Sequence, residues 1–130
     1  MSVARLREMF DRMVVAKDAS AVADFYHPDF QMVSNGVTQG FAAFAASHSN
    51  VYETQITYQV RYDEDAWVET MDRVAGRMWI RTARPGETAT EIEVVLITIY
   101  QDELIYRLWE LTWPDWSQLD AFKNLSLIHI

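Results

Sequence analysis

The stretch FYHPDFQMVSNG, residues 25–36, marks a change of local structure near the start of the chain. An apolar run with helical spacing leads into it. Pro28 disfavours helical geometry at the preceding residue, His27, so the helix is expected to end there. Apolar and polar residues then alternate, which predicts a short strand. One side of this strand carries Phe30, Met32 and Ser34.

The segments around this stretch predict three helices. Apolar side chains recur at helical spacing over residues 3–17, and Asp18 can cap a second, short helix. After the strand, Asn35-Gly36 is a turn signal, and Gly40 opens a third helix. One face of the third helix carries Phe41, Phe44, Ala45, His48 and Tyr52.

From residue 55 onward the apolar period becomes two, which predicts a run of long strands. Two of them flank Pro85-Gly86. If Arg84 lies opposite Thr88, the pairing matches Met78 with Val94, Ile80 with Ile92 and Arg81 with Glu91, so that apolar pairs and an ion pair share one register. Helices followed by a meander of strands predict an α+β fold with an antiparallel sheet.

The last two strands are apolar on both faces, whereas a sheet with one wet face alternates. Something is therefore expected to cover the outer face. A second subunit would do so, which predicts a homodimer; the alternative is the tail, residues 119–130, folding back. The outward apolar side chains are Val95, Ile97, Ile99, Ile105, Trp109, Leu111 and Trp113.

Composition narrows the class of protein. The chain has 130 residues without linkers or repeats, so residues 1–130 are expected to form a single domain. It has no Cys, which excludes thiolate chemistry and fits the cytoplasm. The net charge is -8 and the basic residues are scattered, so neither nucleic acid nor a membrane is an expected partner. No apolar run is long enough to span a membrane.

The order of elements, with FYHPDF at residues 25–30 and IYRLWELTW at residues 105–113, resembles the nuclear transport factor 2-like superfamily and, within it, the SnoaL-like proteins. The resemblance covers nearly the whole chain. It implies a curved sheet wrapped around three helices, an apolar cone-shaped pocket, and dimerisation through the outer face of the sheet. Members include a polyketide cyclase, ketosteroid isomerases, dehydratases, hydrolases and non-catalytic binding modules, so the motifs indicate a fold better than a function.

Glu110 is the main catalytic candidate, because it resembles in position an acid/base aspartate of the SnoaL-like cyclases. If Tyr100 opposes Leu104, Val94 faces Glu110 and the carboxyl group points into the cone. There burial would raise its pKa toward the range useful for proton transfer. A two-residue turn at 102–103 would send Glu110 outward into solvent. The first register puts Tyr106, Leu108, Glu110 and Thr112 on the inner side.

Two other polar residues, Ser34 and His48, each have a possible functional role and a possible structural role. Ser34 stands about where ketosteroid isomerases carry a proton-shuttling aspartate, and helix 1 offers no Tyr donor, so the chain departs from that family. Ser34 would bind a ligand or satisfy a strand-end backbone group. His48 is a general base paired with Glu110 or a structural His, and Tyr106 or His48 would stabilise developing charge.

No metal site or cofactor is expected. His27 and Asp29 are two residues apart, but no third ligand follows at a typical spacing, and His129 lies in the tail. The sequence also has no glycine-rich phosphate loop.

The sequence thus predicts a pocket protein for a small apolar molecule. If catalytic, it is a cofactor-independent isomerase, cyclase or dehydratase that acts on a carbonyl compound by acid/base proton transfer. The alternative is a non-catalytic ligand-binding or dimerisation module. Besides Glu110, His48 and Tyr106, the residues expected to line the pocket are Met32, Ser34, Phe44, Tyr52, Tyr58, Met78, Leu96 and Leu108.

Overall fold

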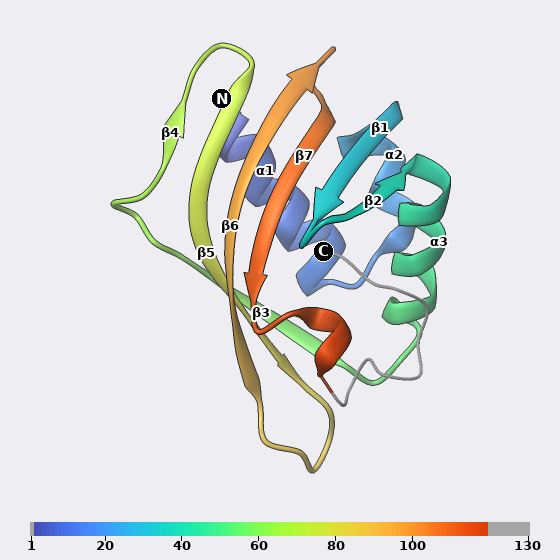
Figure 1. Ribbon diagram of the computed structural model, residues 1–130. Helices are drawn as coiled ribbons and strands as arrows, with labels where there is room; N and C mark the ends of the chain where they lie inside the picture. The colour runs from blue at the N-terminus through green and yellow to red at the C-terminus, as the bar shows by residue number, and fades with distance from the viewer. Residues whose placement is uncertain (1, 120–130) are drawn as a thin grey trace.

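The computed structural model describes residues 2–119, which form helices packed on one curved sheet (Figure 1). The helical elements are α1 (Ser2–Met9), the π-helical η1 (Phe10–Val15), the 3₁₀-helical η2 (Ala19–Ala21), α2 (Val22–Phe25), α3 (Phe41–Tyr52) and a last 3₁₀ turn, η3 (Trp116–Gln118). The first helix expected from the sequence is α1 continued by η1. Asp18 caps η2 as expected, because its carboxylate accepts a hydrogen bond of 3.0 Å from the backbone N–H of Ser20.

The strands are β1 (Tyr26–Ser34), β2 (Val37–Gly40), β3 (Thr57–Tyr62), β4 (Val68–Glu69), β5 (Arg73–Ala83), β6 (Thr90–Gln101) and β7 (Leu104–Trp113). Their order in the sheet is β2-β1-β7-β6-β5-β3, with β4 paired to β5. The pairs are antiparallel except β1 with β7, which run parallel. The antiparallel sheet expected from the sequence is therefore a mixed one, because the β1–β2 hairpin adds to the free edge of β7.

The turn at Asn35-Gly36 is confirmed, since both residues have positive φ, 48° and 84°. It connects β1 to β2, a strand that the sequence did not predict because four residues are too few to show alternation. The expected pairing of β5 with β6 is also confirmed: Met78 faces Val94, and Arg81 faces Glu91. Glu91 makes its ion pair with Arg61 of β3, at 3.1 Å.

The predicted pairing of β6 with β7 is wrong by one residue next to the turn and by two residues beyond the bulge. The chain turns at Asp102 and Glu103, whose φ values are 55° and 64°, so that Tyr100 pairs with Ile105. A bulge then shifts the register, and Glu110 pairs with Leu96 instead of Val94. The bulge restores the predicted phase from residue 107 onward, but it leaves Ile105 buried on the inner side rather than outside.

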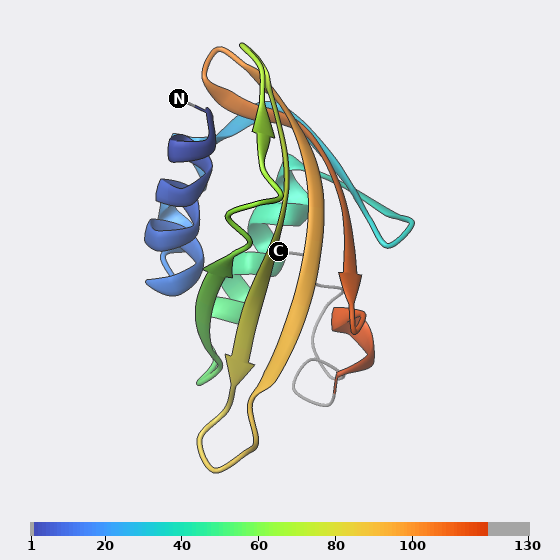
Figure 2. The same cartoon turned by 90° about the vertical axis from the view of Figure 1, so that its left-hand side faces the viewer.

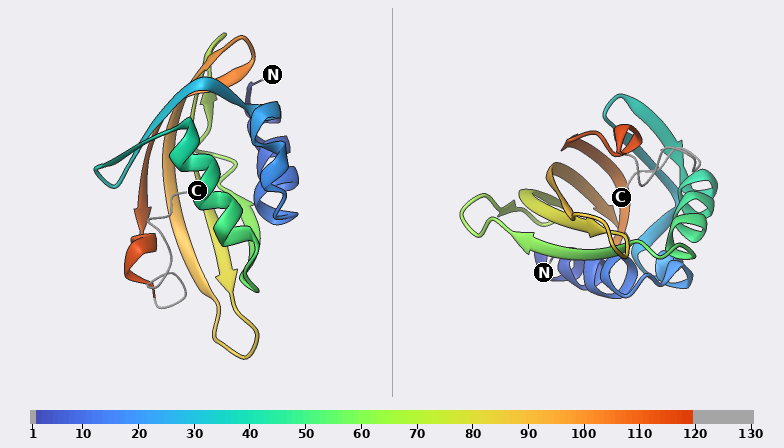
Figure 3. Two further views of the ribbon diagram at one scale, coloured as in Figure 1. Left: turned by 90° about the vertical axis from the view of Figure 1, so that its right-hand side faces the viewer. Right: turned by 90° about the horizontal axis from the view of Figure 1, so that it is seen from below.

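The two faces of the sheet have different surroundings. Figure 2 shows α1 and α3 on the same side of the sheet, and Figure 3 shows from below how the sheet curves around the interior that these helices close. The hydrophobic core lies in this interior. On the outer side, large apolar side chains are exposed: Val95, Ile97, Trp109, Leu111 and Trp113. Among residues 2–119, no helix is long and apolar enough to cross a membrane.

Candidate functional site

Glu110 lies on the inner face of the sheet, in a row of four neighbours on adjacent strands. Gly76 of β5 pairs with Leu96, Leu96 with Glu110, and Glu110 with Ser34 of β1. Glu110 is 4% exposed and Ser34 is fully buried. The Ser34 hydroxyl donates a hydrogen bond of 2.6 Å to Oε1 of Glu110. The inward orientation of Glu110 that the sequence favoured is thus what the structure has.

Burial governs the protonation of Glu110. Loss of solvent raises the pKa of its carboxyl group to about 8, and the hydrogen bond from Ser34 opposes this rise only in part. The group is therefore mostly a carboxylic acid at neutral pH. A carboxyl group with a pKa close to the working pH can both donate and accept a proton, which is the requirement for acid/base catalysis.

Asn35 fixes the end of β1 to β7 on either side of Leu111. Its backbone N–H donates to the carbonyl oxygen of Glu110 at 3.1 Å. Its side-chain Oδ1 accepts from the backbone N–H of Thr112 at 2.9 Å, and its Nδ2 donates to the Thr112 hydroxyl at 2.7 Å. These bonds anchor the backbone of the two strands next to the Ser34–Glu110 contact. The sequence indicated Asn35 only as a turn residue.

A chain of aromatic rings from β1, α3 and β3 forms another part of the interior. Successive ring centroids lie 4.0–6.0 Å apart. The rings are those of Tyr26, Phe30, Phe44, His48, Tyr52 and Tyr58.

His48 and Tyr26 are two buried members of this chain of rings. His48 is buried, and its Nδ1 hydrogen-bonds the carbonyl oxygen of Phe44 at 2.8 Å, so Nδ1 carries the proton when the ring is neutral. Tyr26, which the sequence did not single out, is fully within the core; its pKa is raised by burial first and then by the charges of Tyr52 and Glu110. The ring of Tyr26 also contacts that of Phe44 in α3, with centroids 4.6 Å apart.

Tyr106 is not brought together with Glu110. The bulge in β7 places it where its ring stacks edge-on with His27 at 5.0 Å, and its hydroxyl accepts a hydrogen bond of 3.2 Å from Arg107. The other residues expected to line the pocket are all buried: Met32, Ser34, Phe44, Tyr52, Tyr58, Met78, Leu96 and Leu108. His129 lies outside the described residues.

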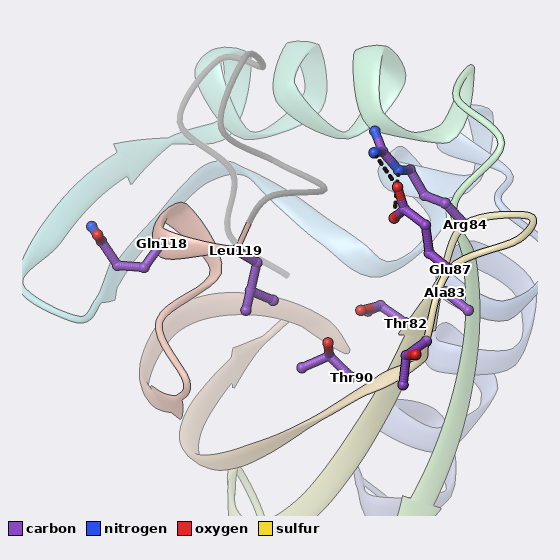
Figure 4. Close-up of a pocket in the computed structure, with 8 residues that line it drawn as sticks. Thr82, Ala83, Arg84, Glu87, Thr90, Gln118 and Leu119 are labelled. Atoms are coloured by element: carbon purple, nitrogen blue, oxygen red, sulfur yellow. Dashed lines mark hydrogen bonds and ion pairs between the residues drawn. The ribbon is translucent and has the colours of Figure 1, made fainter.

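A cavity of about 410 Å³ opens at the far end of β5 and β6 (Figure 4). Thr82 and Thr90, which are paired across the two strands, line it together with Leu119. The guanidinium of Arg84 and the carboxylate of Glu87 form an ion pair of 2.6 Å at its edge. No group of three His, Asp or Glu side chains within residues 2–119 is arranged to hold a metal ion.

No protein-family model matches the chain, and neither does any curated protein. Solved structures do match. A LEH-like epoxide hydrolase from M. tuberculosis superposes with a TM-score of 0.70 at 12% identity, covering 85% of this chain and 81% of its own. A protein from Jannaschia sp. CCS1, proposed to be a SnoaL-like polyketide cyclase, gives 0.65 at 14% identity, covering 85% and 84%.

IdmH from Streptomyces antibioticus, also proposed to be a polyketide cyclase, gives a TM-score of 0.62 at 17% identity, covering 85% of this chain and 88% of its own. These similarities concern the fold. The chain shares with these three structures a nuclear transport factor 2-like fold, a cone of helices packed on a curved sheet. Its fold is similar to that of SnoaL-like proteins, as the sequence predicted.

Proposed function

We propose that the protein binds a small, mainly apolar carbonyl compound inside the cone and transfers a proton on it without a cofactor. Glu110 is the acid/base group, and Ser34 holds its Oε1 so that the other carboxyl oxygen exchanges the proton. The observation that carries the proposal is that Glu110, alone among the carboxyl groups of residues 2–119, is buried on the inner face, at 4% exposed, with Ser34 as its hydrogen-bond donor. Its pKa of about 8 suits proton transfer near neutral pH.

Isomerisation, cyclisation and dehydration of carbonyl compounds are the reactions that this arrangement favours. Each of them begins with proton transfer at a carbon next to a carbonyl group, and a single carboxyl group can remove the proton and return it. His48 lies between Phe44 and Tyr52 in the chain of aromatic rings, and we retain it as a second polar group that could stabilise developing charge. Tyr106 is left out of the proposal because it contacts His27 and Arg107 instead of the interior.

The experiment measures exchange of the protons next to the carbonyl group of a panel of cyclic ketones in D₂O. Wild-type protein should accelerate exchange for at least one ketone, and Glu110→Gln should reduce that acceleration by roughly 100-fold or more. Glu103→Gln, an exposed carboxylate in the turn after β6, is the matched control and should behave as wild type. Equal exchange rates for wild type and Glu110→Gln would contradict the proposal and favour a non-catalytic binding module.

We propose further that two copies of the chain associate through the outer face of β6 and β7. The supporting observation is the exposed apolar surface there, where Leu111 and Trp113 are 68% and 76% exposed. A shallow apolar depression of about 230 Å³ lies between Val95, Ile97 and Trp109 on this face. Exposed apolar surface of this kind marks association sites in soluble proteins. The cytoplasmic location and the lack of a nucleic-acid partner stay predictions.

A further inference from the structure

Within residues 2–119, three tyrosine hydroxyl groups are buried without a hydrogen-bond partner, those of Tyr52, Tyr58 and Tyr62. The first two belong to rings that contact each other. Tyr52 is the last residue of α3 and Tyr58 lies in β3; their ring centroids are 6.0 Å apart and their planes meet at 75°. The residues are 9% and 3% exposed. Within residues 2–119, neither hydroxyl oxygen is within hydrogen-bond distance of a protein group. Burying an unpaired hydroxyl costs free energy that phenylalanine would avoid, so the two oxygens need another explanation.

Both hydroxyl groups are suited to donate hydrogen bonds. Burial raises the pKa of Tyr52 and that of Tyr58, so both keep their protons throughout the physiological range. Among residues 2–119, burial is the leading cause at both tyrosines and no cationic side chain lowers either pKa. An anionic ligand would therefore find no counter-charge here, whereas an uncharged oxygen acceptor would find two donors.

The tyrosine pair lies beside the cavity at the end of β5 and β6. Tyr58 pairs with Thr82, and Thr82 pairs with Thr90, so the three form one row across the inner face. Thr82 and Thr90 both line the cavity of about 410 Å³ (Figure 4). The next row toward Glu110 contains the fully buried Ile80 and Ile92. Polar side chains thus gather at the cavity end of the interior, with an apolar layer beyond them.

We propose that Tyr52 and Tyr58 donate hydrogen bonds to a carbonyl oxygen of the bound molecule, which enters through the cavity beside Thr82. This inference rests on the proposed function, since it names the group by which the same ligand is held. The ligand class is then an uncharged ketone, ester or quinone with an apolar skeleton. Ring contacts run from Tyr52 through His48 and Phe44 to Tyr26. Because Glu110 contributes, after burial and Tyr52, to the raised pKa of Tyr26, the oxygen site and the carboxyl group border one interior region.

The test compares binding of α-tetralone with that of tetralin, the same skeleton without the carbonyl oxygen, by titration calorimetry. Tyr52→Phe and Tyr58→Phe should each raise the Kd for α-tetralone by about three- to tenfold and leave the Kd for tetralin unchanged. The melting temperature of the ligand-free variants should stay the same or rise, because an unpaired buried hydroxyl is removed. Tyr106→Phe, whose hydroxyl bonds Arg107, is the control and should bind both probes as wild type.

Three results would overturn the inference: an unchanged ratio of the two Kd values in both tyrosine variants, a fall in melting temperature with equal loss of both probes, or no binding of either probe to wild type. Glu110→Gln separates this inference from the proposed function. If that variant keeps the preference for α-tetralone and also keeps proton exchange, the oxygen site stands and the catalytic role of Glu110 fails.

Discussion

Residues 109–112 of β7 alternate between two opposite environments within a single strand. Glu110 and Thr112 point inward and are buried, whereas Trp109 and Leu111 point outward and are 42% and 68% exposed. The polar side chains are thus inside and the apolar ones outside, the reverse of an ordinary half-buried strand. Folding of a single chain explains neither side. The buried carboxyl group of Glu110 is suited to proton transfer, and the exposed apolar surface is suited to contact with a partner.

The largest expected effect concerns the inner side and the dependence of stability on pH. The pKa of Glu110 is about 8 in the folded protein, against 4.5 for an ordinary Glu, so the folded state binds this proton more tightly than the unfolded state. Its contribution to stability is complete below about pH 4.5 and is lost as the pH rises through 8. The free energy of unfolding should fall by up to roughly 5 kcal/mol across this window.

Glu110→Gln tests this by urea unfolding at pH 5 and pH 9. The variant should have a stability close to that of wild type at pH 5 and a higher one at pH 9, because Gln carries no charge to bury. Other groups titrate alike in both proteins, so the difference between the two curves isolates Glu110. A difference that does not change with pH would mean that the carboxyl group is solvated, and the contrast between the two sides of β7 would disappear.

The second prediction concerns the outer side. Leu111→Glu introduces a charge at the centre of the exposed apolar surface of β6 and β7, and it should convert a dimer into a monomer at micromolar concentration. Gln59→Glu, the matched control, changes an exposed position of β3 that pairs with Arg81 and lies outside the apolar surface. Light scattering measures the mass of each. A wild-type monomer, or a Leu111→Glu dimer, would exclude association through this surface.

The sequence predicted the two sides of β7 correctly from residue 107 onward, but not at Ile105 and Tyr106, and it misplaced the pairing with β6. The pairing of β5 with β6 was predictable because apolar pairs and a Pro-Gly turn agreed on one register. The turn after β6 was not, since Asp102 and Glu103 adopt positive φ without a glycine. That turn alone would send Glu110 outward, but the bulge at Tyr106 turns it inward again. Two deviations from regular pairing cancelled, and the pattern of apolar residues records neither.

The candidate site was predictable residue by residue but not as a set. Periodicity placed Ser34 and Glu110 each on an inner face. Their contact depends on the parallel pairing of β1 with β7. No local pattern reveals this pairing, because β1 is the first strand in the sequence and β7 is the last. The same holds for Asn35 and Thr112, whose bonds link a turn to a strand more than seventy residues away. These long-range polar contacts could therefore be identified only in the three-dimensional structure.

The third prediction concerns the end of β1, where Asn35 follows Ser34 and hydrogen-bonds Thr112 of β7. We expect the effect of changing Asn35 on Glu110 to be small. Asn35→Gly keeps the positive φ of 48° but removes both side-chain bonds to Thr112. Ser34 would then lie at a loosened strand end, and its hydrogen bond, which lowers the pKa of Glu110, would weaken. We expect the pKa of Glu110 to rise further above 8, by up to about one unit, and stability to fall by about 1–2 kcal/mol.

NMR titration of the carboxyl carbon of Glu110 measures this shift, and Asn35→Asp is the conservative comparison, because its carboxylate can still accept from the backbone N–H of Thr112. Asp should keep most of the stability that Gly loses. A purely structural Asn35 would lower stability in Asn35→Gly and leave the pKa of Glu110 where it is in wild type. Such a result would mean that Asn35 does not influence the contact between Ser34 and Glu110, and that Ser34 alone positions the carboxyl group.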